Sequence, residues 1–249
     1  RRQSQMCIRD SNTEEQGFNI LQGTRALVEF RYNQSFSKNN SFNLIRFDLR
    51  HYQKIHNELT LATRIYMGKS FGINPQKFLL GGVPNWVLAR TKEHSGGDPL
   101  SVANEIDNSN LLFTEFVNHM RGYDLNEKYG TAVMLINLEL KFPVFQYLSR
   151  FPVKSTFLRN FMLVAFTDIG SAWDGRIPIT RKGSIIFIDY EETPFKANVA
   201  NYASPWLASC GFGLRTALLG YYLKIDYARP IEDFEIKSAK FTLSLGIDF

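Results

Sequence analysis

The chain has 249 residues, of which 44% are hydrophobic and 21% charged. This composition excludes an intrinsically disordered chain, and the lack of any apolar run of about 18 residues excludes ordinary membrane-spanning helices. The formal net charge of +5 comes from basic residues scattered along the chain, which argues against a nucleic-acid-binding segment.

The first sixteen residues are polar and lack the apolar core of a signal peptide. Either the protein is not exported or its true N-terminus is missing. The stretch from Gln5 to Ser11 resembles a translated adaptor sequence, so we expect residues 1–16 to be a disordered leader, possibly an artefact of assembly. We expect residues 17–249 to form a single β domain.

From Gly17 the sequence alternates between apolar and polar residues, which indicates strands with one buried face. Three runs show the pattern, over 26–32, 45–50 and 59–67, and the links between them are short. We therefore predict an antiparallel meander. Their polar positions include Glu29, Arg46, Asp48, Arg50, Arg64 and Tyr66.

The alternation stops between Ser70 and Tyr129, where glycine, proline and polar residues dominate. A connection of this length is usually functional or disordered. Part of it, Val102 to His119, could form a short helix. Near its end lies Arg121-Gly122-Tyr123, which is either a solvated turn or a loop tip whose arginine needs buried acceptors.

Two acidic positions offer such acceptors. Alternation resumes at Gly130 and runs to Phe142, with Asn137 and Glu139 on the polar side; Asp168 lies on the polar side of the next run, 161–173. A strand with its apolar face in lipid would place both carboxylates on the opposite face.

Three further strands are predicted over 206–218, 221–229 and 241–249, and the chain ends on Phe249. Periodicity alone fits a soluble β-sandwich or small ligand-binding barrel equally well. The connections favour a transmembrane barrel, because short links alternate with the long stretches 70–129 and 174–204. Aromatic residues near the predicted strand ends fit membrane interfaces: Trp173, Trp206, Tyr227 and Phe249.

Five motifs, in this order, resemble the C-terminal barrel of the BamA-like superfamily, also called the bacterial surface antigen family. They are Phe78-Leu79-Leu80-Gly81-Gly82, Met120-Arg121-Gly122-Tyr123, the run from Asn137 to Pro143, the run from Phe166 to Gly170, and Gly211-Phe212-Gly213-Leu214-Arg215. The resemblance extends from about Phe18 to the end, where Phe249 resembles the terminal aromatic of the family's closing strand.

The resemblance implies specific roles. The segment 70–129 would be a long extracellular loop that folds into the lumen, with Arg121 paired to Asp168 and held near Glu139. Tyr123 would pack near Val133 and Leu135. The remaining implied site positions are Gly122 in the loop, the glycines Gly170, Gly211 and Gly213 that leave room for it, and the lumen-wall residues Asn137 and Arg215.

The sequence departs from the family in two respects. Residues Val83 to His119 separate the Gly81-Gly82 element from Arg121, whereas the two lie close together in better-known members. In addition, about eight strands are visible, whereas the family barrel has roughly sixteen. We therefore expect the C-terminal half of a transmembrane β-barrel.

The resemblance implies a non-enzymatic outer-membrane protein that assists insertion or translocation of proteins. Its partners would be outer-membrane lipid, unfolded outer-membrane or secreted client proteins, and periplasmic or lipoprotein accessory subunits, with no nucleic acid. The alternatives are an outer-membrane esterase or lipase, or a passive pore or anchor. The four histidines are spread over predicted turns and the insertion, and no dense cluster of metal ligands occurs in the sequence, so no cofactor or metal is expected.

Overall fold

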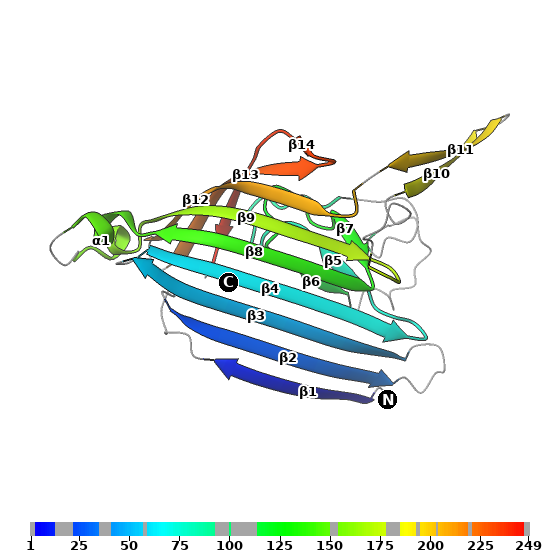
Figure 1. The fold of residues 1–249 in the computed structure, drawn as a ribbon, viewed down its shortest axis with the longest axis horizontal. Helices are drawn as coiled ribbons and strands as arrows, with labels where there is room; N and C mark the ends of the chain where they lie inside the picture. The colour runs from blue at the N-terminus through cyan, green and yellow to red at the C-terminus, as the bar shows by residue number, and fades with distance from the viewer. Residues whose placement is uncertain are drawn as a thin grey trace.

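The computed structural model describes residues 3–12, 22–34, 41–56, 59–92, 100, 114–149, 154–177, 185–192, 195–202, 204–218 and 221–246. Most of these residues belong to one ten-stranded antiparallel sheet (Figure 1). Its strands are β1 (Gln3–Asn12), β2 (Gly23–Gln34), β3 (Phe42–His56), β4 (Leu59–Gly72), β8 (Ala132–Phe142), β9 (Met162–Trp173), β12 (Leu207–Leu218), β13 (Tyr221–Glu232), β14 (Glu235–Ile236) and β15 (Lys240–Leu245).

The prediction of an all-β, antiparallel fold is confirmed. The sheet order is β1-β2-β3-β4-β8-β9-β12-β13, and both β14 and β15 pair with β13. Strands adjacent in the sheet thus follow one another along the chain, as in a meander. Within the described ranges, no ladder joins β1 to β15, so the sheet is open.

The prediction of a disordered leader is wrong for residues 3–12. These residues form β1, which pairs antiparallel with β2 from Gln3 opposite Gln34 to Asn12 opposite Arg25. The polar composition of this stretch hid its ability to extend a sheet, because backbone hydrogen bonds do not depend on side-chain polarity. Together with β14, which is two residues long, β1 brings the large sheet to ten strands, whereas about eight were predicted.

The two faces of the sheet differ in an unusual sense. Charged side chains are buried and large apolar ones are exposed: Glu29 is 0% exposed beside Phe30 at 40%, and Glu139 is 1% exposed beside Leu138 at 44%. The same alternation continues along β9, where Asp168 is buried and Ile169 exposed. The chain's own insertion contacts the buried polar face, and the described apolar side chains of the other face are exposed.

That insertion contains a second, three-stranded sheet, formed by β5 (Phe78–Leu80), β6 (Glu115–Val117) and β7 (Lys128–Gly130). Its order is β6-β5-β7, with β5 and β6 parallel. In Figure 1, these strands lie behind the large sheet, and β5 contacts both β8 and β9. Residues 114–119 are therefore not helical as predicted, because β6 pairs with the buried strand β5; residues 101–113 lie outside the described residues.

The connections divide between two rims. One rim carries the β4–β8 insertion and the β9–β12 connection, which contains a hairpin of β10 (Ile185–Glu192) and β11 (Phe195–Tyr202). The opposite rim carries the short β3–β4 and β12–β13 links and the helices α1 (Val144–Leu148) and α2 (Thr156–Arg159) (Figure 1). Neither these helices nor any other in the described ranges is long and apolar enough to cross a membrane.

The last predicted strand, 241–249, is described only as far as Gly246. β15 ends at Leu245, and Gly246 follows with a φ of +122°, a conformation that glycine accommodates without strain. The predicted closing residue, Phe249, lies outside the described residues.

Candidate functional site

The Arg121-Gly122-Tyr123 turn lies between β6 and β7, on the polar face of the sheet. Gly122 has a φ of +85°, and a Cβ there would lie 3.2 Å from the Cβ of Ala228 on β13. The turn therefore approaches the wall so closely that a side chain at this position would meet both backbone strain and contact.

Arg121 is held by carboxylates from two neighbouring strands. Its Nε donates to Asp168 Oδ2 at 2.7 Å and its Nη2 to Asp168 Oδ1 at 2.6 Å, a two-point contact, while Nη1 donates to Glu139 Oε1. Its backbone N–H donates to Asp168 at 3.2 Å. The side chains of all three residues are at most 4% exposed. The geometry matches the fork of a guanidinium to a carboxylate.

Two further wall residues complete this environment, which we call the Arg121 anchor (Arg121, Asn137, Glu139, Phe166 and Asp168). Asn137 Nδ2 donates to Asp168 Oδ1 at 2.7 Å and to the carbonyl of His119 at 2.6 Å. The guanidinium carbon of Arg121 lies 3.7 Å from the centre of the Phe166 ring. Burial lowers the pKa of Arg121, but the charges of Asp168 and Glu139 outweigh it and raise that pKa well above its ordinary value.

Tyr123 links the same turn to two other strands. Its hydroxyl lies 2.8 Å from the carbonyl oxygen of Ala208 and 3.0 Å from that of Ile231, to either of which it can donate. Its ring belongs to an apolar cluster that includes Leu80, Val133 and Leu135. The inward-facing apolar residues of β8 thus cover an apolar part of the loop.

The insertion does not separate the two loop motifs in space. Gly82 and Met120 form an antiparallel bridge, and the N–H groups of His119 and Met120 both donate to the Gly82 carbonyl at 3.0 Å. A Cβ at Gly81 would collide with the carbonyl oxygen of Asp124, and one at Gly82 with the Leu125 side chain. The chain therefore leaves at Val83 and returns at His119 beside the point where it left.

The expected roles of the wall glycines need correction. A Cβ at Gly170 would lie 3.2 Å from Leu80 Cδ2 of the loop, so Gly170 does leave room for it. Gly211, however, faces Phe166 and the backbone of Tyr227 and Ala228, and Gly213 faces Arg215 and Asp226. These two glycines make space for wall side chains, because Arg215 lies along the wall and forms a buried ion pair with Asp226 at 2.7 Å.

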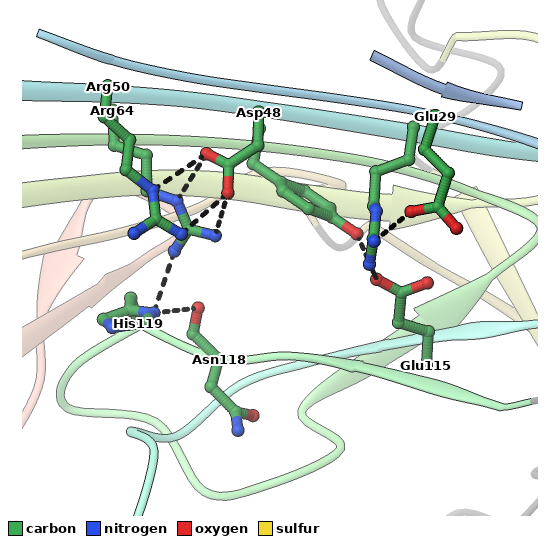
Figure 2. Close-up of polar contacts among 9 residues, drawn as sticks. Glu29, Asp48, Arg50, Arg64, Glu115, Asn118 and His119 are labelled. Carbon is green, nitrogen blue, oxygen red and sulfur yellow. Dashed lines mark hydrogen bonds and ion pairs between the residues drawn. The ribbon is translucent and has the colours of Figure 1, made fainter. Parts of the chain in front are cut away.

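A second set of contacts, which sequence reasoning missed, holds the loop to β2, β3 and β4 (Figure 2). Glu115 on β6 accepts hydrogen bonds from Arg46 Nη1 and from the Tyr66 hydroxyl, both at 2.6 Å. Arg46 also pairs with the buried Glu29. We call Glu29, Arg46, Tyr66 and Glu115 the Glu115 anchor. Alternation had placed its wall residues on the polar face, but nothing in the sequence marked Glu115 as their partner.

His119 lies between the two anchors. Arg64 Nη1 and the carbonyl oxygen of Asn118 both lie 2.9 Å from His119 Nδ1, and Arg64 is itself held by Asp48 at 3.0 Å through both Nε and Nη2 (Figure 2). Burial and then the charges of Arg64, Lys224 and Arg121 lower the pKa of His119 well below its ordinary value. The lowered pKa keeps the ring neutral at pH 7.

Comparison with known proteins places the fold. The structure is similar to the crystal structure of BamA from Haemophilus ducreyi lacking POTRA domains 1–3, with a TM-score of 0.56 and 17% sequence identity. The match covers 98% of this chain and 42% of that chain, so this chain spans less than half of the solved structure. No family model and no curated protein matches the sequence. At this identity the likeness shows a BamA-like fold.

Proposed function

We propose that this chain is part of an outer-membrane β-barrel of the insertase or translocase kind, which assists the assembly or translocation of other proteins without enzymatic chemistry. The observation that carries the proposal is the inverted burial of the sheet. Buried charged and exposed apolar side chains alternate along its strands, which is stable where the apolar face meets hydrocarbon. In water, an uncovered apolar face of this extent would favour aggregation.

The position of the insertion supports the same proposal. A lumen-facing loop held by a buried arginine would fix the curvature of a wide sheet, because it ties β8 and β9 to the loop at one place and β2–β4 at another. At one end of the sheet Trp173 and Trp206 lie with ring centroids 6.3 Å apart, as expected of an interfacial girdle. Tyr227 instead lies within β13 and packs on Phe241.

Under this proposal the chain supplies the C-terminal half of the barrel, and the segment 70–129 is an extracellular loop. The partners would be membrane lipid, unfolded client proteins and accessory subunits. Client strands would be accepted by edge pairing at a seam beside the last strand, since an edge strand presents unpaired N–H and C=O groups. The functional role assigned to Arg121, Glu139 and Asp168 is to hold the loop in the shape this seam requires.

The test is client insertion by the intact protein in lipid vesicles. Arg121→Ala should reduce the rate at which a urea-unfolded outer-membrane protein folds into the vesicles, with heat-modifiable migration of the client on gels as the readout. Arg229→Ala is the control, because the Arg229 side chain is exposed, alternates along β13 with Ala228, which faces the loop, and donates to Tyr227. Unchanged barrel folding together with unchanged client insertion in Arg121→Ala would remove the loop from the mechanism. A wild type that inserts no client would favour a passive pore or anchor.

A further inference from the structure

A short segment of the insertion pairs with the last strand. Trp86 forms an antiparallel bridge with Ser244, the Val87 N–H donates to the Leu243 carbonyl at 2.9 Å, and the Leu245 N–H donates to the Asn85 carbonyl at 3.3 Å. On its other side β15 pairs with β13. Over Leu243–Leu245, β15 is therefore bonded on both sides, by the sheet and by the chain's own insertion.

This segment is tied at both ends to the Arg121 turn. It begins directly after the Gly82–Met120 bridge and ends where Thr91 pairs with Leu125. Two backbone hydrogen bonds reinforce this second contact. The Lys92 N–H donates to the Leu125 carbonyl and the Leu125 N–H donates to the Arg90 carbonyl, both at 2.8 Å. Lys240, the first residue of β15, forms an ion pair with Asp124 at 3.0 Å. The last strand and the loop tip thus share one set of contacts.

The pairing between residues 85–87 and β15 is weak. Two backbone hydrogen bonds hold it, and its apolar side chains are poorly covered, with Val87 51% and Leu88 79% exposed. Asn85 has a φ of +53°, a left-handed conformation that interrupts an extended strand. A longer extended strand aligned with β15 could form more hydrogen bonds than this segment and replace it.

We propose that Asn85–Val87 is a placeholder strand, which covers the Leu243–Leu245 edge of β15 until a client β-strand displaces it. The inference rests on the proposed function and adds a regulatory element to its seam. In the resting protein the placeholder prevents unspecific edge pairing, which is a hazard for any exposed strand. Because it is continuous with the Arg121 turn, its release and the position of the loop are linked.

Hydrogen exchange provides the first test. Two amide protons report on the two paired strands separately: the Val87 N–H belongs to the placeholder, and the Leu245 N–H belongs to β15. When a urea-unfolded outer-membrane protein is added to the protein in vesicles, Val87 should exchange at least tenfold faster, while Leu245 stays protected by the client strand. Unchanged protection of Val87 during insertion, or equal loss at both amides, would overturn the proposal.

A disulfide cross-link tests whether release of the placeholder is necessary for client insertion. Residues 86 and 244 face each other between the two flanking hydrogen bonds, a geometry in which a disulfide can form. In a background with Cys7→Ser and Cys210→Ser, the double variant Trp86→Cys/Ser244→Cys should lose most client insertion when oxidised and regain it on reduction. The single-cysteine variants, treated with the same oxidant, are the controls.

A weakening variant tests the opposite direction. Val87→Pro removes the N–H that bonds to Leu243, whereas Val87→Ala keeps it and loses only side-chain atoms. Val87→Pro should raise the initial rate of client insertion several-fold over Val87→Ala. If the oxidised double variant remains active while the wild type is also active, the placeholder is refuted and the proposed function stands. If the wild type inserts no client, the proposed function and the placeholder fail together.

Discussion

The two anchors hold the same loop to the same sheet with different degrees of burial. In the Arg121 anchor, the paired side chains of Arg121, Glu139 and Asp168 are at most 4% exposed. In the Glu115 anchor, the side chains of Arg46 and Glu115 are 27% and 21% exposed. Because an unpaired buried charge is much costlier than a hydrated one, the first anchor should determine whether the loop docks, and the second how it is oriented.

The largest effect is expected from Asp168→Asn. The change removes the carboxylate that receives three hydrogen bonds from Arg121 and leaves the guanidinium buried with one charged partner. Loss of one partner of a buried ion pair costs about 3 to 5 kcal/mol. We expect that loss in the free energy of unfolding measured by denaturant titration in lipid, with protease sensitivity of the loop increasing in parallel.

The control is Glu235→Gln, since the Glu235 side chain is 76% exposed. That change should stay within about 0.5 kcal/mol of the wild type. An Asp168→Asn protein as stable as the Glu235→Gln protein would contradict the importance of the buried anchor.

A somewhat smaller effect is expected at Gly82, which connects the loop motifs. Gly82 has a φ of +70° and its Cβ would collide with Leu125, whereas Gly175 has a φ of +77° and nothing within 4 Å. Gly175→Ala therefore isolates the backbone cost of about 1 to 2 kcal/mol, and Gly82→Ala should add about 1 to 3 kcal/mol of steric strain. Thermal unfolding of both variants measures the difference. Equal losses of stability in the two variants would mean that the Leu125 side chain moves aside without cost.

The Glu115 anchor should respond more weakly. Glu115→Gln and Tyr66→Phe each weaken or remove a partly hydrated hydrogen bond, at about 1 to 2 kcal/mol. Their double variant should be less destabilised than the sum of the singles, because both changes act on the same 2.6 Å contact. Strict additivity in unfolding titrations would show that the two side chains do not interact in the protein.

The smallest effect is a pH dependence from His119. Its pKa is lowered in the folded protein, so below about pH 6.5, the ordinary value, the unfolded chain takes up a proton that the folded one resists. Docking should therefore be unaffected above that pH and weaken as the pH falls below it, by at most about 1.4 kcal/mol per pH unit. Arg64, Lys224, Arg121 and Arg50 oppose the added charge.

His119→Gln retains a side-chain acceptor without a titrating group. Loop protection against protease between pH 7.5 and 5.5 should then be less pH-dependent than in the wild type. An equal slope in both proteins would assign the pH dependence to other groups.

Most of the sheet could be predicted from sequence because period-two alternation is a local signal. The strands at 132–142 and 162–173 agree with prediction to within about two residues, and Glu139 and Asp168 lie on the predicted face. The antiparallel order followed from short links. β1 escaped prediction because its residues alternate weakly and its pairing depends on the neighbouring strand β2.

The insertion was less predictable, because its structure depends on contacts distant in sequence. β6 forms by pairing with β5, and Glu115 accepts a hydrogen bond from Arg46, which is 69 positions away in the sequence. Phe78 packs where Gly68 lacks a side chain, another complementarity that no local pattern reveals. The partners of Arg121 were available from the family resemblance, whereas the roles of Gly211 and Gly213 required the geometry of the wall.

The central claim, that the apolar face of the sheet meets lipid and the polar face encloses the loop, is tested most directly by fluorescence quenching. In a background with Trp86, Trp173 and Trp206 replaced by phenylalanine, single tryptophans would be placed by Leu138→Trp, outward and exposed, or Met162→Trp, inward and buried. In vesicles of lipids brominated on the acyl chains, the tryptophan at 138 should be strongly quenched and that at 162 nearly unaffected. Equal quenching at the two positions, or none at 138, would contradict the account.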